Sequence, residues 1–566
     1  MPSITINEKD NTLYNVSDNS SDNIVYVIGA SIKGTTEPTL CRNFNEFVAE
    51  FGTTPPQVNV GTYGCAWDYA TNLLLGGFPV LFQRVISYTD SNGDEVSISK
   101  TATVALDDGE ETPTKQMDIY ASEAGSYGND TKVKFESPTI TTGTPSTMSA
   151  GNITAVITKG TKTENIVVCT IPENDTPMTG SADVTVSKLF FEGIKKVVSS
   201  LVKFAPVSTL TVNTFVVADG WFTQGTTEVV FTLGATDDTK GTDPLETDVY
   251  TNTETVAYAI EQDQSFFDVL KDQDLVDVKF LTLGGKTNLL DESLATPAYT
   301  QKAIKALVDI AEGRKDCLAV LDIPASIEPD DGDVSDITNH YSFVASSYAT
   351  CFESWIYFQL PRTAETKIMP PSFVFLYELA KSIKNGNPIW LSPAGVRRGL
   401  VPEASKAVFE IGSVIAEKLQ SNLPFVNPIR RIRNYGYAIF GQKTLYVVNN
   451  DFTGSVRSAF QDLNVRITAN EIKRKIRDIS ISLTFEGNNL KTWNEFRGQL
   501  DPYLSQISAD GALDNYKIVM DETTTTEDDI NNNTVRGKVI VRIARTAEDF
   551  NIDFIVTNDT AVFSEG

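Results

Sequence analysis

Histidine and cysteine are scarce in this 566-residue chain. His340 is the single histidine, so a Ser-His-Asp triad would depend on it, and a zinc site built from several histidines is excluded. The five cysteines are an odd number without a Cys-x-x-Cys pair, which is typical of reduced core thiols in a protein assembled in the cytosol. His340 and Cys351 are explained better as a helix-surface histidine and a buried thiol than as a catalytic pair.

The chain also lacks long apolar runs and an excess of positive charge. No segment approaches 18 consecutive apolar residues, and the N-terminus has no signal-peptide pattern, so we expect neither a signal peptide nor membrane insertion. The formal charge of −27 disfavours direct binding to nucleic acid. What is present is 41% hydrophobic and 10% aromatic residues, enough for several buried cores in a chain whose length suggests roughly four domains.

One block of the chain departs from this acidity. Residues 397–498 hold 16 Lys and Arg against 9 Asp and Glu, and they include an amphipathic helical pattern at 464–483. Thr468 and Glu471 have the spacing of a capping box that would start this helix. One face carries isoleucines at helical spacing, namely Ile472, Ile476 and Ile479. We expect the opposite face to present a cationic ridge of Lys473, Arg474 and Arg477.

The remaining pattern predicts an α/β core interrupted by an insertion. A buried-strand run at 24–30 precedes a short helix at 44–51, and strands alternate with helices again from residue 263. Between them the chain is rich in Thr, Ser, Asp and Gly with short β-branched runs, which indicates a β-rich insertion. We therefore predict an α/β core with a mixed sheet covered by helices, a β-rich insertion domain, an α+β C-terminal domain and extended terminal arms.

Each terminal arm alternates apolar residues without a local partner. The predicted parts in chain order are an N-terminal arm (1–22), the core (23–87 plus 263–427), an insertion of one or two subdomains (88–262), the C-terminal domain (428–548) and a C-terminal arm (549–566). The alternating residues are Ile4 and Ile6 in the first arm and Phe550, Ile552, Phe554 and Val556 in the last. Such a segment is either disordered or a strand that completes another chain's sheet.

Three motifs resemble binding sites without completing them. Residues 284–287 hint at a P-loop, but Phe280 stands where that pattern needs a glycine. Residues 330–333 lack the spacing and the glutamate of an EF-hand loop, and the acidic residues at 521–529 fit a solvated loop better than a metal site. We expect no catalytic, metal or cofactor site, and no enzyme.

The sequence contains a series of short motifs, among them the Pro-Ala-Gly at 393–395, the Asn-Pro-Ile-Arg at 427–430 and the Asn-Val-Arg at 464–466. Together these motifs resemble stretches of the sheath proteins of contractile phage tails and related contractile injection systems. Their order along the chain carries the resemblance, and the C-terminal third contributes most of it. The Pro-Gly-Val-Tyr usual near the N-terminus is absent. The other stretches lie at 27–34, 44–52, 76–85, 124–129, 441–445, 485–493 and 521–530.

The resemblance implies a helical cylinder of identical subunits around a tail tube, which contracts to drive the tube through the host envelope for genome delivery. The implied partners are other copies of this chain, the tail tube protein, and baseplate and tail terminator proteins, in a virion tail assembled in the host cytoplasm. Lys473, Arg474 and Arg477 become tube-contact candidates, although a solvated helix face or an intersubunit contact explains them equally well. The alternative is a carbohydrate-binding or adhesin-like structural protein of a virion, whereas a flavodoxin-like hydrolase lacks its catalytic set.

Overall fold

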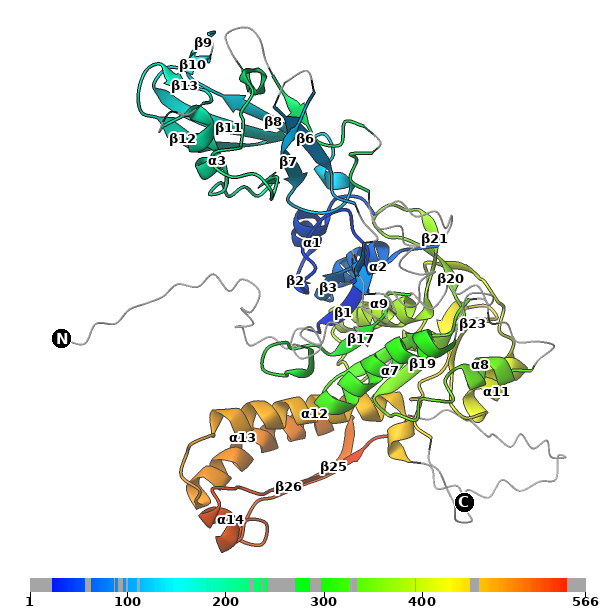
Figure 1. The fold of residues 1–566 in the computed structure, drawn as a ribbon. Coiled ribbons are helices and arrows are strands. Elements are labelled where there is room, and N and C mark those ends of the chain that lie inside the picture. The colour runs from blue at the N-terminus through cyan, green and yellow to red at the C-terminus, as the bar shows by residue number, and fades with distance from the viewer. Residues whose placement is uncertain are drawn as a thin grey trace, which may run out of the picture. The chain divides into compact units, whose positions relative to one another are not determined.

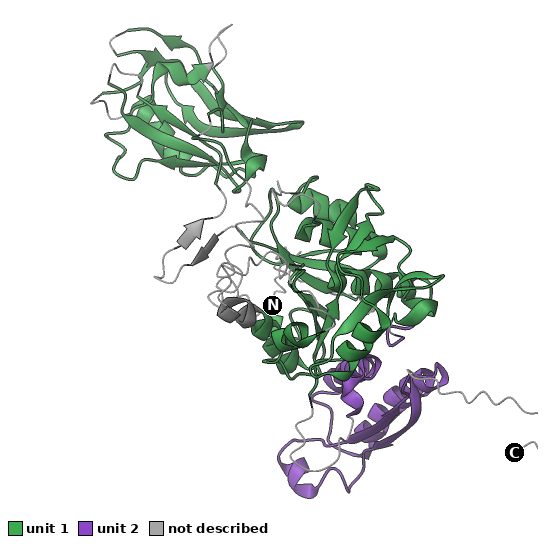
Figure 2. Cartoon of the chain, turned by 90° about the vertical axis from the view of Figure 1, so that its right-hand side faces the viewer, with its two compact units in different colours: residues 1–387, 393–449 green, residues 388–392, 450–566 purple. Residues whose placement is uncertain are grey.

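The structure is a computed structural model of the chain, shown as a ribbon in Figure 1. It divides into two compact units, unit 1 with residues 1–387 and 393–449, and unit 2 with residues 388–392 and 450–566 (Figure 2). The structure describes residues 23–55, 63–85, 87–89, 95–97, 100–108, 112–143, 145–180, 182, 184–223, 229–236, 238–242, 270–285, 297–325, 327, 333–391, 393–447 and 458–546.

Unit 1 is built on an eight-stranded mixed sheet (Figure 1). Its central strands run parallel, and the strand at each edge is antiparallel to its neighbour. The mixed sheet predicted from the sequence is therefore present. In spatial order the strands are β2 (Thr39–Cys41), β3 (Val80–Arg84), β1 (Val25–Gly29), β17 (Phe280–Thr282), β18 (Leu318–Asp322), β19 (Ala349–Glu353), β23 (Asn427–Ile432) and β24 (Gly436–Ile439).

Helices cover both faces of this sheet, which explains why β1, β18 and β19 are buried at every position. Helices α2 (Ala66–Gly76) and α9 (Pro371–Lys384) pack on one face, where the ring of Tyr69 meets that of Phe373. Helices α7 (Pro297–Arg314), α8 (Ser335–His340) and α11 (Ser413–Ser421) share a buried core with the other face. A smaller sheet of β21 (Thr366–Met369), β20 (Ile356–Gln359) and β22 (Ala404–Ala407) also belongs to unit 1.

The helix predicted at 44–51 is present as α1 (Phe44–Phe51). The side chain of Asn43 accepts a hydrogen bond from the backbone N–H of Glu46 at 2.9 Å and so caps the first turn. The helix ends at Gly52, whose φ of 98° few other residues adopt. Phe47 and Phe51 are fully buried, as their helical spacing predicts.

Strands β23 and β24 correct the predicted start of the C-terminal domain at residue 428. They extend the core sheet, because β23 pairs in parallel with β19 and β24 pairs with β23. Asn427 secures this junction: its Nδ2 donates to the carbonyls of Cys351 (2.9 Å) and Lys443 (2.8 Å). The same Nδ2 donates to Thr350 Oγ1 at 3.1 Å, and Asn427 Oδ1 accepts from the backbone N–H of Lys443 at 2.6 Å. The main segment of unit 2, residues 450–566, therefore begins only after the core sheet is complete.

The described strands of the predicted insertion share none of their pairings with the core sheet. Except for the strands at 87–89 and 95–97, they surround a separate buried core, in which Phe190 of α3 (Val186–Ile194) contacts Phe135 and Trp221. This β-rich character agrees with the composition of 88–262. The largest sheet contains β12 (Lys162–Ile171), β11 (Gly151–Lys159), β8 (Lys132–Glu136) and β15 (Phe222–Thr223), and β16 (Phe231–Thr232) also pairs with β8. Two three-stranded sheets contain β14 (Val202–Pro206), β7 (Lys115–Ala121) and β6 (Thr103–Asp107), and β13 (Thr176–Pro177), β10 (Thr147–Met148) and β9 (Ile140–Thr141). The last sheet is the pair β4 (Ser87–Thr89) and β5 (Glu95–Ser97).

Unit 2 contains a pair of helices packed on a two-stranded antiparallel sheet. Its buried core includes Trp493, Leu500 and Leu504, which lie on one face of α13 as their spacing in the sequence predicts. The elements are α12 (Leu463–Ser482), α13 (Leu490–Ala509), β25 (Leu513–Val519), the short α14 (Glu527–Asn531) and β26 (Lys538–Ile543).

Both predicted arm strands fall outside the described residues. These positions are Ile4, Ile6, Phe550, Ile552, Phe554 and Val556. Within the part of the chain that is described, no helix combines the length and the apolar character needed to cross a bilayer.

Candidate functional site

Helix α12 carries the cationic residues marked by the sequence, but it begins earlier than predicted. Its first residue is Leu463, more than one turn before Thr468. The predicted capping box is therefore wrong. Thr468 is buried inside the helix, where its Oγ1 donates to the carbonyl of Asn464 at 2.7 Å. A threonine hydroxyl that bonds to the carbonyl one turn back is typical of a helix interior, and Thr468 has this role rather than that of a cap.

Lys473, Arg474 and Arg477 lie in the second half of α12 and are half-buried rather than fully exposed. Each already has an interaction within the structure, so none is a free cation. Burial lowers the pKa of the Arg474 guanidinium to about 10, although the nearby carboxylate of Asp478 raises it. The isoleucine face of the helix packs into the core of unit 2, as predicted. The ridge thus stands on an anchored helix, and part of each of the three residues is still accessible.

The hairpin of β25 and β26 has one face in the core of unit 2 and one face in solvent. Val539 and Val541 of β26 pack toward the core, whereas the alternate residues Lys538, Ile540 and Arg542 are exposed. This is the alternation expected for a strand covered on one side. Among the described residues no third strand pairs with the hairpin, so both outer edges carry unpaired backbone groups. An open edge of this kind can accept a strand from another chain.

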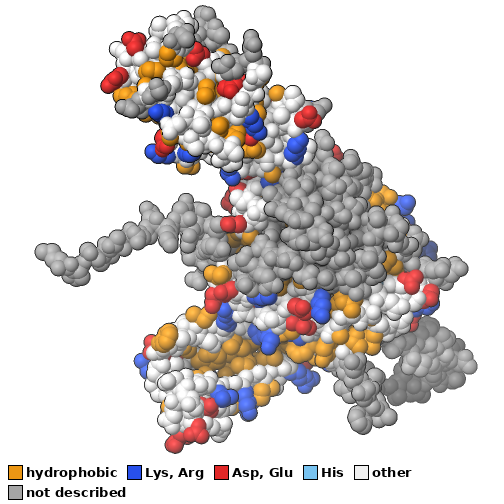
Figure 3. Space-filling model, in the orientation of Figure 1, with side chains coloured by type: hydrophobic (Ala, Val, Ile, Leu, Met, Phe, Trp, Pro, Cys, Tyr) orange, Lys and Arg blue, Asp and Glu red, His pale blue; other side chains and the backbone are white. Residues whose placement is uncertain are grey.

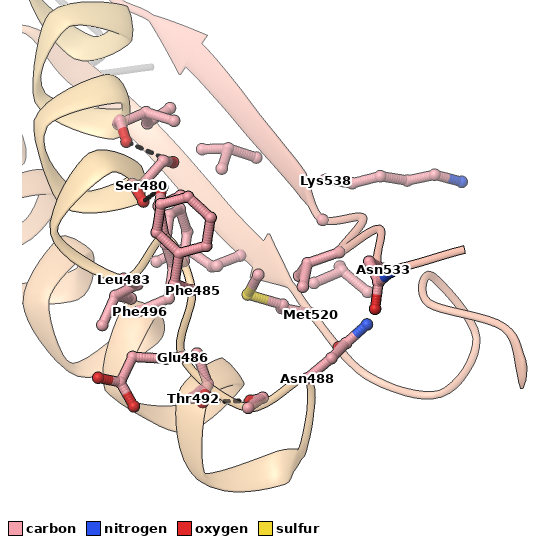
Figure 4. A pocket seen from close by; sticks show the side chains of 18 residues that line it. Ser480, Leu483, Phe485, Glu486, Asn488, Thr492, Phe496, Met520, Asn533 and Lys538 are labelled. Atoms are coloured by element: carbon pink, nitrogen blue, oxygen red, sulfur yellow. Dashed lines mark hydrogen bonds between the residues drawn. The ribbon is translucent and has the colours of Figure 1, made fainter. Parts of the chain in front are cut away.

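A cavity of about 800 Å³ lies between the end of α12, the start of α13 and the hairpin (Figure 4). Leu483, Phe496 and Met520 contribute apolar walls. Apolar side chains also gather on the surface of unit 2 between its helices and its hairpin (Figure 3). Phe485 lines the cavity, yet it is fully exposed and has a φ of 71°. A left-handed backbone costs a non-glycine residue about 1 kcal/mol. Together with the apolar side chains gathered on this surface, the exposed Phe485 ring makes this region a candidate interaction surface.

The acidic segment 521–529 is held by its own hydrogen bonds. The N–H of Asp529 donates to Thr526 Oγ1 (3.3 Å), and the N–H of Thr526 donates to Asp529 Oδ2 (3.1 Å), which forms a capping box for α14. The N–H and Oγ1 of Thr526, which donate to Asp529 Oδ2, and the Arg536 Nε, 2.7 Å from Asp529 Oδ1, lower the pKa of Asp529. Within the described ranges no three His, Cys, Asp or Glu side chains are grouped as a metal site would need.

Two buried carboxyl groups that sequence reasoning missed lie at the carboxyl ends of adjacent parallel strands. Asp322 ends β18 and Glu353 ends β19. Asp322 accepts hydrogen bonds from the N–H (2.6 Å) and Oγ (2.7 Å) of Ser372 in the first turn of α9, and burial raises its pKa to about 7. Burial also raises the pKa of Glu353, whose two carboxyl oxygens have no hydrogen-bond partner among the described residues. In the sequence, each of these two apolar strand segments ends in a residue with a carboxyl group, and this pattern could have identified the pair.

The remaining sequence candidates form no reactive group. Burial lowers the pKa of the half-buried His340 to about 4 and raises that of the Cys351 thiol, so at neutral pH both are uncharged. The expected buried thiol is confirmed, whereas the histidine is less exposed than expected. Gly284 and Gly285 form a turn after β17 with φ of 66° and 81°, and the rest of the P-loop-like motif lies outside the described residues.

Comparisons with known proteins confirm the resemblance read from the sequence. Residues 455–557, which include most of unit 2, match the model of the phage tail sheath C-terminal domain family. The tail sheath protein of Enterobacteria phage T4 is 27% identical over 365 residues, covering 61% of this chain and 52% of that protein. The tail sheath protein of Vibrio phage KVP40 is 27% identical over 176 residues, covering 31% of this chain and 25% of that protein. The chain thus spans about half, or less, of the length of these relatives.

A solved structure extends the likeness to the fold of nearly the whole chain. The crystal structure of a sheath tail protein from Listeria innocua has a TM-score of 0.50 and 11% sequence identity, and the alignment covers 93% of this chain and 96% of that one. At this identity the likeness concerns the fold. The chain is therefore similar to tail sheath proteins in the sequence of its C-terminal part and in the fold of mixed sheets and helices.

Proposed function

We propose that this chain is the structural subunit of a contractile tail sheath, which polymerises helically around a tail tube and contracts to drive the tube through a host envelope for genome delivery. The observation that carries the proposal is the match of residues 455–557 to the sheath C-terminal domain, within a chain whose fold resembles a sheath tail protein over nearly its whole length. The role is structural rather than enzymatic. The proposed location is the virion tail, with assembly in the host cytoplasm.

The open edges of the β25–β26 hairpin support polymerisation by strand addition. Among its described residues unit 2 has two unpaired strand edges, and the sequence has alternating apolar residues near both termini, Ile4 and Ile6 in one arm and Phe550 to Val556 in the other. A strand donated from one copy to the next makes a head-to-tail contact that does not close, and such contacts generate helical arrays. Backbone hydrogen bonds in the shared sheet would tether neighbouring copies while their domains rotate during contraction.

In this proposal each predicted domain has its own position in the sheath. The C-terminal domain faces the tube, and the insertion at 88–262 faces outward. Lys473, Arg474 and Arg477 remain candidates for tube contact, because part of each side chain is accessible on an anchored helix. Exposed ion pairs contribute about 1 kcal/mol or less each, so binding strength would come from repetition along the cylinder. Baseplate and tail terminator proteins would bind at its ends.

Deletion of residues 1–22 tests the proposal. The purified full-length chain should form hollow, striated cylinders in negative-stain electron microscopy. The deletion variant should have an unchanged circular dichroism spectrum and remain monomeric in analytical ultracentrifugation, because the strand that joins neighbouring copies is missing. Long cylinders from the deletion variant would contradict strand addition by this arm, and a full-length chain that never forms cylinders would contradict the sheath function itself.

A further inference from the structure

The hairpin of β23 and β24 carries arginines that the core of unit 1 does not use. Arg430, Arg431 and Arg433 lie within it, and Tyr435 in its turn is 61% exposed. A structural arginine in the same unit looks different: the guanidinium of Arg84 donates to the backbone carbonyls of residues 31, 34 and 124 at 2.6–3.1 Å. The hairpin arginines therefore need another explanation than support of the fold.

The three guanidinium groups of the hairpin have no acidic partner in the described part of the chain. Arg431 and Arg433 are exposed, and no ion pair of the described residues includes any of the three. Arg430 is half-buried with its guanidinium 4.3 Å from the centre of the Phe440 ring, and its Nε atom is enclosed without a hydrogen-bond partner. An enclosed donor without an acceptor costs roughly 1–3 kcal/mol, so an acceptor beyond the described residues would complete this site.

The backbone holds these side chains on a rigid element. Register pairs run from Ile429 opposite Ile439 to Ile432 opposite Gly436. The N–H of Tyr435 closes the turn on the carbonyl of Ile432 at 3.1 Å. Because the guanidinium group presents several donors in a planar fork, arginines fixed on a strand are well suited to bind carboxylates in defined geometry.

The net charge of the chain indicates which partner would bind the arginines of the hairpin. Outside residues 397–498 the chain has 31 Lys and Arg against 65 Asp and Glu, so a second copy offers the hairpin a strongly acidic surface. We propose that the arginine hairpin, residues 427–440, binds carboxylates on a second copy of this chain. This inference rests on the proposed function, in which copies pack side by side. It adds a contact between bodies of the subunits, separate from strand addition by the arms.

The double variant Arg431→Glu/Arg433→Glu tests this contact. We expect the critical concentration for cylinder formation, measured by sedimentation, to rise about tenfold or more, because attraction at two positions becomes repulsion. The thermal midpoint of the unassembled subunit should stay unchanged, since neither side chain supports the fold. For the wild type, raising sodium chloride from 50 to 500 mM should also raise the critical concentration, because salt screens exposed pairs.

Matched variants separate the contact from a general charge effect. Arg431→Lys/Arg433→Lys keeps the charge and should assemble within about threefold of the wild type. Lys132→Glu/Lys203→Glu makes the same change in net charge at exposed strand positions of the insertion and should also assemble normally. Normal assembly of the glutamate variant would overturn the proposal, and so would equal losses in the glutamate variant and the lysine-to-glutamate control. Failure of the wild type to form cylinders in any salt would instead count against the sheath function.

Discussion

Two carboxyl groups in the core of unit 1 link its stability to pH. Asp322 and Glu353 are both fully enclosed between the sheet and its helices, and burial raises both pKa values above those of an unfolded chain. A group whose pKa is raised on folding stabilises the folded state at low pH, and this contribution is lost as the pH rises through the folded pKa. For Asp322 the loss falls between about pH 4 and pH 7, and for Glu353 it begins near the unfolded pKa of 4.5 and is complete only well above it.

Replacing Glu353 with glutamine should therefore reduce the alkaline sensitivity of the protein. The side chain keeps its size but cannot ionise, so the variant should be more stable than the wild type at pH 9 by about 1–3 kcal/mol and nearly equal to it at pH 4, below the unfolded pKa. Thermal unfolding of the unassembled subunit at both pH values measures this. The exposed Glu417→Gln on α11 is the control and should leave the pH dependence unchanged. Parallel pH profiles for Glu353→Gln and the wild type would show that this carboxyl does not titrate as the structure indicates.

At the scale of elements, helix α13 connects the core of unit 2 to the surface proposed for assembly. Trp493, Leu500 and Leu504 are buried on one face of the helix and hold the β25–β26 hairpin against it. Leu490 at its first turn is 56% exposed. The same amino acid thus has two different roles on one helix, which allows a matched comparison.

Leu500→Ala should destabilise unit 2 by about 2–5 kcal/mol, because it removes buried methyl groups and leaves a cavity. Leu490→Ala should change stability by less than about 0.5 kcal/mol. Hydrogen exchange over residues 490–509 in the full-length chain measures both, and protection should fall for the first variant alone. Equal protection in both variants would mean that α13 is not anchored through Leu500.

At the scale of the whole molecule, the proposed sheath must hold the tube and still release it. Half-buried cations on α12 suit that requirement, because each contributes little alone and many act together along a cylinder. The variant Lys473→Glu/Arg477→Glu should still form tube-free cylinders but should bind tail tubes at least tenfold more weakly in co-sedimentation. An unchanged melting temperature controls for folding, and tube binding at wild-type strength would remove these residues from the tube contact.

Local patterns in the sequence anticipated individual elements well. The helix from Phe44, the isoleucine face of α12 and the alternation in β26 are present because each depends on periodicity over a few turns or residues. The predicted capping box at Thr468 is absent because a local pattern does not show where a helix begins. A Thr-x-x-Glu spacing marks a helix start only if the preceding residues are not helical, and here they continue the helix back to Leu463.

The sequence by itself determined the acidic charge with its basic block, the lack of a histidine-based site, the α/β pattern and the resemblance to tail sheath proteins. Only the tertiary structure decided that β23 and β24 complete the core sheet, because strand pairing joins residues far apart in the chain. It also brought Asp322 beside Glu353 and left the cations of α12 half-buried. Burial and pairing are set by what packs against a residue, and no local pattern contains that information.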